Sequence, residues 1–283
     1  DEGQLKIMVL LDLKLRLLAF EKDLKDFQLP EPTEEELAAV EVLTAGRSVV
    51  VNEELDFDVA SLAEQAECHI ERDYFTEEQR VIYNRIVDAV ETQTPLYLFV
   101  SARGGCGKTY LLNAVLMRVR SLEAGGCVAL AMATTGIAAV LLDNGRTFHS
   151  RMKAPLNPTE DSMLRIPAQS ELAKLVRMAK LLIVDEATML DNRLLAALDR
   201  SLCDLMNSDK PFGGKIIVLS GDFRQCLPVV PQASRAGIVD ICVNQSPLWQ
   251  HFEVMELNQN MRVRACGDRE LIRWDEWTQS VGN

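Results

Sequence analysis

The pattern of hydrophobic and polar positions changes near residue 76. Before that point, apolar residues recur at the spacing of amphipathic helices over residues 1–28, 33–44 and 55–70. The run Leu29-Pro-Glu-Pro32 separates the first two of these predicted helices. None of them carries a pattern of catalytic residues. We therefore predict a helical arm or linker over residues 1–72, with a surface that docks a partner as the alternative interpretation.

From Thr76 onward, short apolar runs alternate with helical patterns. Thr76 and Gln79 have the spacing of a capping box, so a helix is expected to begin there. The alternation of strands and helices predicts an α/β fold, with a parallel sheet covered on both faces, over residues 73–283. The predicted strands are residues 96–100, 127–133, 181–184 and 216–219, and the predicted helices are residues 110–120, 136–142 and 190–205.

Acidic residues are concentrated in the N-terminal part of the chain. The formal net charge is −12, but residues 1–80 carry 21 acidic and 8 basic side chains, whereas residues 81–283 carry 21 acidic and 22 basic ones. The predicted arm is therefore acidic and the α/β part is nearly neutral. A nearly neutral domain suits weak binding of a nucleic-acid strand through a local basic groove.

Composition excludes several classes of protein. A content of 48% hydrophobic and 25% charged residues is typical of globular proteins and excludes wholesale disorder. The apolar stretches are far shorter than the ~20 residues of a membrane-spanning helix, and the N-terminus lacks the pattern of a signal peptide. The seven cysteines include no CxxC pair, which argues against a disulfide scaffold and a zinc site. We expect a protein of a reducing intracellular compartment without a membrane partner.

A glycine-rich segment follows the first predicted strand and precedes a predicted helix. Its sequence is Ser101-Ala-Arg-Gly-Gly-Cys-Gly-Lys-Thr109. Glycines let the backbone turn tightly and aim its N–H groups at phosphate oxygens, and the following helix adds its dipole. Lys108 is expected to reach the β- and γ-phosphates of ATP, and the Thr109 hydroxyl to bind Mg²⁺. The alternative is an ordinary glycine-rich turn. The predicted nucleotide-binding residues of this loop are Gly104, Gly105, Cys106, Gly107, Lys108 and Thr109.

Two other strands are expected to bring polar groups to the same nucleotide. The buried run Leu181-Leu-Ile-Val-Asp-Glu186 ends in two carboxylates. Asp185 is expected to hold Mg²⁺ through water, and Glu186 to orient and deprotonate the attacking water. A solvated acidic strand end is the alternative. The strand over residues 216–219 is followed by Gln225, which becomes a candidate for sensing the γ-phosphate, although Gly221-Asp222 is also typical of a turn.

Five segments together indicate a family. They are Ala133-Thr-Thr-Gly-Ile-Ala-Ala139, Gly145-Arg-Thr-Phe-His-Ser150, Asp185-Glu-Ala-Thr-Met189, Gly221-Asp-Phe-Arg-Gln-Cys-Leu-Pro228 and Leu257-Asn-Gln-Asn-Met-Arg262. Their order resembles the successive motifs of the Pif-family DNA helicases, which are superfamily-one, 5′-to-3′ motors with RecA-like domains. The residues within these motifs are most similar to those of the branch carried by Helitron transposons. The resemblance covers about residues 70–283.

The resemblance implies roles that spacing alone does not. It implies that Gln79 contacts adenine and that Arg262 contacts the γ-phosphate. Gln79 also occupies position N3 of the capping box, which is the alternative interpretation. Stacking of His149 or Phe148 on a base is a further implication, with a structural histidine as the alternative for His149. The residues implied to contact single-stranded DNA are Thr134, Thr135, Gly136, Thr147 and His149.

The implied function is ATP hydrolysis coupled to movement along single-stranded DNA and duplex unwinding, in DNA repair, recombination and telomere maintenance. The implied location is the nucleus, with the mitochondrion as a second one. Ala102 and Thr188 depart from the family pattern, in which glycine and proline are usual. The family's second motor domain is expected to be absent from these residues, so this chain alone is not expected to unwind DNA.

Two other functions compete with this interpretation. The first is a remnant that binds nucleotide or DNA without doing work, which Ala102 favours. The second is a phosphotransferase with a phosphate-binding loop. The pair Asp185 and Glu186 disfavours it, because transfer to an acceptor other than water has no need of the glutamate. Gln225 disfavours it as well.

Overall fold

The computed structural model describes residues 24–27, 29–30, 33, 49–71, 75–122, 127–229, 234–261, 263 and 277. The chain divides into two compact units, Asp1–Glu53 and Glu54–Asn283. In the first unit, Leu24–Phe27 forms a 3-10 helix (η1). The helices predicted over residues 1–28 and 33–44 otherwise lie outside the described residues. The domain division predicted between residues 72 and 73 stays a prediction, whereas the second compact unit begins at Glu54.

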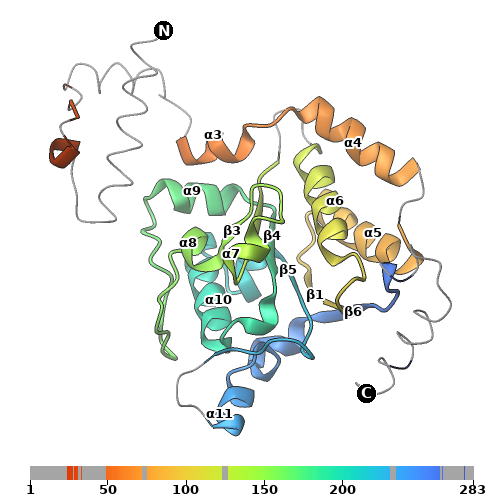
Figure 1. Cartoon of the computed structure of the whole chain (residues 1–283). Helices are drawn as coiled ribbons and strands as arrows, with labels where there is room; N and C mark the ends of the chain where they lie inside the picture. The colour runs from red at the N-terminus through yellow and green to blue at the C-terminus, as the bar shows by residue number, and fades with distance from the viewer. Residues whose placement is uncertain are drawn as a thin grey trace. The chain divides into compact units, whose positions relative to one another are not determined.

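A parallel sheet of six strands forms the centre of the second unit (Figure 1). The strand order is β3-β2-β4-β5-β1-β6, and every neighbouring pair is parallel. The four predicted strands are therefore confirmed, while β3 and β6 at the two edges were not predicted. The strands are β1 (Tyr97–Ala102), β2 (Ala129–Ala133), β3 (Arg146–Thr147), β4 (Leu181–Asp185), β5 (Ile216–Gly221) and β6 (Glu253–Leu257).

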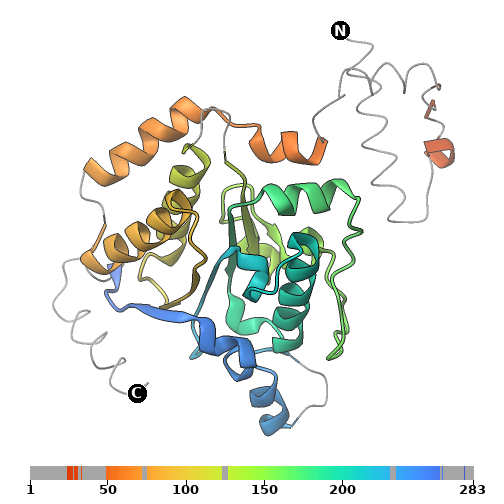
Figure 2. The same ribbon diagram turned by 180° about the vertical axis from the view of Figure 1, so that it is seen from behind.

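Helices cover both faces of this sheet (Figures 1 and 2). On one face, α5 (Glu77–Glu91) and α6 (Lys108–Arg120) share a buried apolar cluster with alternate residues of the strands, such as Leu98 and Val218. On the other face lies α10 (Asn192–Met206). The predicted α/β fold is thus confirmed. Among the described residues, the other α-helices are α3 (Val49–Leu55), α4 (Val59–Glu71), α7 (Gly136–Ala139), α8 (Phe148–Met152), α9 (Glu171–Met178) and α11 (Arg235–Asp240).

A buried ion pair joins the start of the second unit to α8, the helix that follows β3. Arg151 in α8 donates to Glu54, and the two side chains are 2% and 1% exposed. Asn144 donates to the second oxygen of Glu54 at 3.0 Å, and Arg151 Nη2 donates to the Asn144 carbonyl at 3.0 Å. In addition, α4 packs against α6. Residues 54–71, which we predicted as part of an arm or linker, therefore belong to the packed body of the second unit.

Replacing Arg151 with methionine is expected to lower the free energy of unfolding by about 3–5 kcal/mol, because the Glu54 carboxylate stays buried without its cation. The matched control is Arg85→Met, which removes an exposed pair with Glu253, both side chains being 45% exposed. That control variant is expected to lose only about 0–1 kcal/mol of its free energy of unfolding. Urea denaturation of both variants checks the difference. If both variants lost the same free energy of unfolding, the assignment of Glu54 to the folded body would be contradicted.

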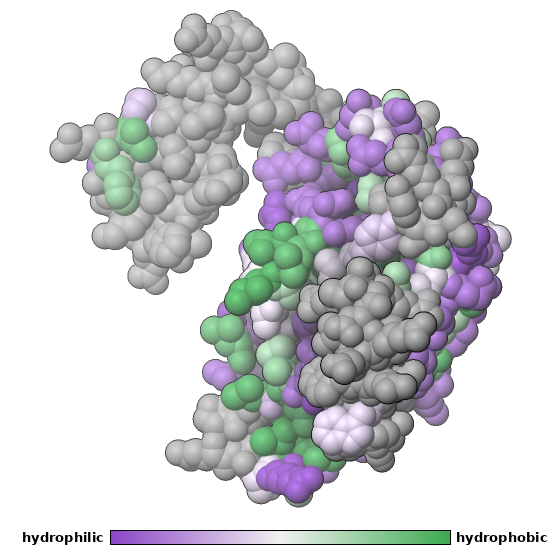
Figure 3. Space-filling view, turned by 45° about the vertical axis from the view of Figure 1, so that its right-hand side comes forward, coloured by the Kyte–Doolittle hydropathy of each residue, from purple (hydrophilic) through white to green (hydrophobic). Residues whose placement is uncertain are grey.

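The face of the second unit drawn in Figure 3 carries both polar and apolar residues. Figure 3 shows a green band of hydrophobic residues along one side of this unit, next to a largely purple surface. Among the exposed large hydrophobic residues, Ile137 and Val140 are 81% and 79% exposed. Both follow residues 134–136, the first segment that the resemblance implies to contact DNA. None of the helices in the described ranges is long and apolar enough to cross a bilayer.

Candidate active site

The predicted phosphate-binding loop forms the turn between β1 and α6. Gly105 and Gly107 have φ angles of 87° and 77°, a region that a residue with a Cβ atom seldom adopts. Since α6 begins at Lys108, the loop leads directly into a helix N-terminus, where the first backbone N–H groups have no partner within the helix. The loop is also held from outside. Gln79 Nε2 donates to the Cys106 carbonyl at 3.0 Å, and the Met261 N–H donates to the Gly105 carbonyl at 2.9 Å.

Gly107→Ala is expected to raise the Kd for ATP about tenfold or more, because the loop must change shape. An added Cβ would lie 2.5 Å from Gln79 Nε2, at a backbone position that alanine disfavours. Gly104→Ala is expected to cost less, since the nearest atom to its added Cβ is Gln225 Nε2 at 3.6 Å. Titration with a fluorescent ATP analogue compares the two variants. A larger loss of affinity in Gly104→Ala would show that the loop has a different conformation.

Gln79 performs two structural tasks at once. Its backbone N–H donates to Thr76 Oγ1 at 3.2 Å, and its Oε1 accepts from the Thr76 N–H at 3.0 Å, which confirms the predicted capping box. The same amide donates to the phosphate-binding loop at Cys106, and the residue is only 1% exposed. The side chain therefore couples the start of α5 to the loop. The adenine contact implied for Gln79 stays a prediction.

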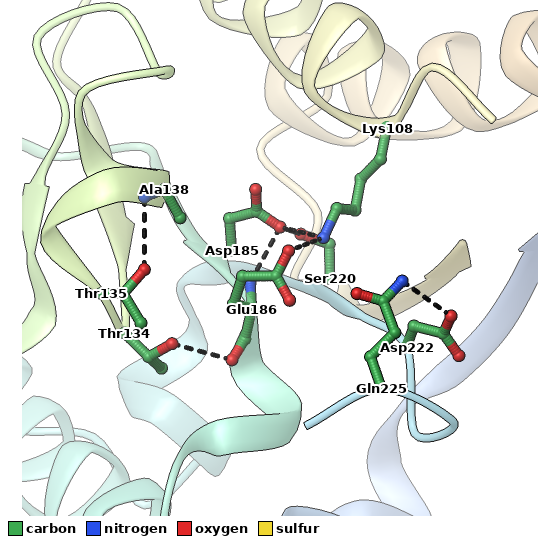
Figure 4. A network of polar contacts seen from close by, with 9 residues as sticks. All are labelled: Lys108, Thr134, Thr135, Ala138, Asp185, Glu186, Ser220, Asp222 and Gln225. Carbon is green, nitrogen blue, oxygen red and sulfur yellow. Dashed lines mark hydrogen bonds and ion pairs between the residues drawn. The ribbon is translucent and has the colours of Figure 1, made fainter. Parts of the chain in front are cut away.

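Lys108 joins the loop to the two carboxylates (Figure 4). Its Nζ donates to Asp185 Oδ1 at 2.8 Å and to Glu186 Oε1 at 2.6 Å. Burial lowers the pKa of Lys108, but the charges and hydrogen bonds of the two carboxylates outweigh burial and hold that pKa above its ordinary value. The structure thus brings together three predicted residues from two separate elements. A charged ammonium of this kind, close to a helix N-terminus, can bind the phosphate oxygens of a nucleotide.

Asp185 is held by several donors at the carboxyl end of β4. Its Oδ1 also accepts from Ser220 Oγ at 2.7 Å and from the Glu186 N–H at 2.8 Å, and the residue is 2% exposed. Ser220 is a neighbour of the candidate site that was not predicted from the sequence. Because Val184 pairs with Leu219 in the sheet, the next residues on β4 and β5 lie side by side. The alignment of the two strand ends was the signal that could have identified Ser220.

Gln225 lies beside the phosphate-binding loop, as its predicted role requires. Its Nε2 donates to Asp222 Oδ2 at 3.0 Å (Figure 4). The same nitrogen is the nearest atom to a Cβ added at Gly104. Asp222, a further neighbour that was not selected from the sequence, therefore fixes the amide. Contact with a γ-phosphate stays a prediction. Arg262 lies outside the described residues, although the preceding residue, Met261, contacts the loop through its N–H.

Two predicted metal ligands supply oxygen atoms of the kind that Mg²⁺ prefers. They are the Asp185 carboxylate and the hydroxyl of Thr109, which stands in the first turn of α6. No cluster of three or more His, Cys, Asp or Glu side chains suited to a metal occurs within the ranges that the structure describes. A magnesium ion that arrives with a nucleotide needs only one or two carboxylates, since phosphates and water complete its coordination. The Asp185 carboxylate and the Thr109 hydroxyl are oxygen donors of this kind, so the residues fit Mg²⁺.

The first segment implied to contact DNA lies at the same edge of the sheet. Thr134 follows β2, and its Oγ1 donates to the backbone carbonyl of Glu186 at 3.0 Å (Figure 4). Thr135 is the N-cap of α7 and accepts from the Ala138 N–H at 3.2 Å. A Cβ added at Gly136 would meet no atom within 4 Å, so the backbone there is open to a ligand.

The second implied DNA segment lies next to the first in the sheet. Thr147 pairs with Ala133, and its side chain accepts from the Ser150 N–H at 3.3 Å as the N-cap of α8. Burial lowers the pKa of His149, which favours its neutral form. Phe148 is fully buried, so the expectation that this ring stacks on a base is wrong. The apolar position was interpreted as a contact surface, but it belongs to the core. DNA contacts of Thr147 and His149 stay predictions.

Comparison with known proteins agrees with this geometry. The family described as PIF1-like helicase matches residues 74–283. Among curated relatives, the ATP-dependent DNA helicase RRM3 of Saccharomyces cerevisiae is 33% identical over 62% of this chain and 23% of its own length. The ATP-dependent DNA helicase Pif1 of a Psychrobacter species is 34% identical over 59% of this chain and 25% of its own length.

Solved structures give the same result. The Bacteroides Pif1 helicase in complex with ADP-AlF3 and single-stranded DNA superposes with a TM-score of 0.56 and 29% identity, over 66% of this chain and 42% of that one. For the Pif1 helicase of Candida albicans the TM-score is 0.55 at 25% identity, over 70% of this chain and 42% of that one. The chain thus spans less than half the length of the relatives it matches. Because the family match covers most of the sequence and the fold agrees, the chain belongs to the PIF1-like helicases.

Proposed function

We propose that residues 54–283 act as the ATP-hydrolysing motor domain of a 5′-to-3′ DNA helicase, which moves along single-stranded DNA as it turns over Mg·ATP. The observation that carries this proposal is the position of Lys108. Its ammonium lies 2.8 Å from Asp185 and 2.6 Å from Glu186, and it links the loop to both carboxylates. A cation beside a candidate base suits attack of water on a γ-phosphate. Membership of a family of ATP-dependent DNA helicases supports the same conclusion.

Each residue of the site has a separate task in this proposal. Lys108 stabilises charge on the phosphates, Glu186 orients the water and accepts its proton, and Gln225 contacts the γ-phosphate. Thr109 and Asp185 hold Mg²⁺, which supplies positive charge at the phosphates when it is bound. The remaining proposed nucleotide contacts are Gln79 at the adenine, Arg262 at the γ-phosphate, and the backbone of Gly104, Gly105, Cys106 and Gly107.

The proposed path of single-stranded DNA follows the carboxyl edge of β2 and β3. Thr134, Thr135 and Gly136 follow β2, and Thr147 and His149 end or follow β3. Hydroxyl groups and an open glycine let a sugar–phosphate backbone approach closely. One similar structure, a complex of the Bacteroides Pif1 helicase, contains single-stranded DNA, which supports this ligand class.

Phosphate release from Mg·ATP, measured during titration with a single-stranded oligonucleotide, tests the proposal. We expect this chain to hydrolyse ATP slowly, with a rate that rises weakly with single-stranded DNA and responds less to a blunt duplex of the same length. A chain that binds ATP and DNA but releases no phosphate would instead be the non-enzymatic remnant. Transfer of the γ-phosphate to an added acceptor, rather than to water, would indicate a phosphotransferase.

We further propose that the complete protein acts in DNA repair, recombination and telomere maintenance in the nucleus, with the mitochondrion as a second location. The family match and the yeast relatives named as DNA helicases support a role on DNA. Imaging of a fluorescent fusion of the full-length protein, with markers for both organelles, tests the location.

A further inference from the structure

The candidate base, Glu186, has an unusual backbone. Its φ and ψ angles are 53° and 35°, the left-handed region that residues with a Cβ atom seldom adopt. Such a conformation persists only where the surroundings enforce it, and it occurs often at functional sites. Because the backbone turn sets the direction of the side chain, the groups that enforce the turn also determine where the carboxylate lies.

Three hydrogen bonds enforce this turn. The Glu186 N–H donates to Asp185 Oδ1 at 2.8 Å. Its carbonyl accepts from the Met189 N–H at 3.0 Å and from Thr134 Oγ1 at 3.0 Å. The first two bonds are local to the turn that follows β4. The third comes from the end of a different strand, and Thr134 is its donor.

Thr134 donates two hydrogen bonds to the backbone of Asp185 and Glu186. Besides its hydroxyl bond, its N–H donates to the Asp185 carbonyl at 3.1 Å. Thr134 is also the first residue of the segment Thr134-Thr135-Gly136, which continues into α7. Figure 4 shows Thr134 and Thr135 on one side of Glu186, with Lys108 on the other. A shift of this segment therefore acts directly on the backbone that orients Glu186.

We propose that Thr134 is a positioning residue for Glu186. Its hydroxyl holds the left-handed turn that directs the carboxylate, and binding of single-stranded DNA at residues 134–136 reaches the hydrolytic site through this bond. The inference rests on the proposed function, in which Glu186 handles the water and residues 134–136 contact DNA. It adds a physical link between the proposed DNA contact at residues 134–136 and the carboxylate of Glu186.

The test compares three variants of the 283-residue chain. Thr134→Val removes the hydroxyl and keeps the shape, and Thr134→Ser restores a hydroxyl. Thr188→Val is the matched control, because Thr188 is buried two residues from Glu186 and its hydroxyl makes no hydrogen bond among the described residues. Thr134→Ala replaces Thr134→Val if the latter lacks a cooperative thermal transition. Single-turnover hydrolysis of Mg·ATP is measured with and without saturating single-stranded oligonucleotide, together with the Kd of each ligand.

Thr134→Val is expected to hydrolyse ATP about 10- to 100-fold more slowly, with and without DNA, because the base is misplaced. Its Kd for ATP is expected to stay within about twofold of the wild type, since the phosphate-binding loop is intact. Thr134→Ser and Thr188→Val are expected to behave like the wild type. A residue that only contacted DNA would raise the Kd for DNA and leave the DNA-free rate unchanged.

Two results separate the failure of this inference from that of the proposed function. If the wild type hydrolyses ATP and Thr134→Val keeps its DNA-free rate, the positioning role is overturned and the proposed function stands. The same holds if Thr134→Ser is as slow as Thr134→Val. If the wild type binds ATP but releases no phosphate, the proposed function fails and the positioning role fails with it.

Discussion

Replacing Lys108 with alanine is expected to lower the rate of ATP hydrolysis by about 10²- to 10³-fold, the usual cost of removing one donor that stabilises a charged transition state. The Lys108 ammonium is the cation that the structure places between the phosphate-binding loop and the two carboxylates. Its loss also leaves Asp185 and Glu186 adjacent without this positive charge, and their negative charges oppose the approach of a polyanionic nucleotide. The Kd for ATP is therefore expected to rise as well.

Phosphate release and fluorescent-nucleotide binding measure both effects of Lys108→Ala. Lys174→Ala is the matched control, because that lysine forms an exposed pair with Glu171, with side chains 58% and 45% exposed. The control is expected to retain wild-type hydrolysis and affinity. An unchanged rate in Lys108→Ala would rule out the assignment of residues 104–109 as the phosphate-binding loop.

Glu186→Gln is expected to lower turnover by about 10²- to 10⁴-fold, because it removes a base and keeps the shape of the side chain. Binding of Mg·ATP is expected to persist, since the amide no longer repels the phosphates. Asp185→Asn is expected to act differently and to raise the Mg²⁺ concentration needed for half-maximal binding of ATP, because the carboxylate is the better ligand for a hard cation. A Mg²⁺ titration of both variants distinguishes the two roles, and identical curves would contradict the division between them.

Local patterns made much of this site predictable. Gly105 and Gly107 of the phosphate-binding loop have backbone angles that few other residues adopt, so the spacing of glycines helps to identify the turn. The four central strands are continuous apolar runs, which is typical of a parallel sheet buried on both faces. Asp185 and Glu186 could be placed because polar residues at the carboxyl ends of such strands gather at one edge.

Contacts between distant residues were not predictable in this way. The sequence contains no sign that Glu54 and Arg151 meet, since neither lies in a motif and their pairing depends on how the chain packs. The edge strand β6 is mostly exposed and carries Glu253 and Glu256, so its pattern differs from that of the buried central strands. Gln79 was predicted as either a capping residue or an adenine contact, and its bond to the loop through Cys106 was found only in the structure.

Single-turnover hydrolysis of Mg·ATP by the chain bound to single-stranded DNA tests the central claim most directly. The wild type and Glu186→Gln are compared at the same occupancy of nucleotide and DNA. We expect the wild type to release phosphate and Glu186→Gln to hold intact ATP over the same period. Equal release by both proteins, or none by the wild type at full occupancy, would contradict the assignment of this site as a DNA-dependent ATPase.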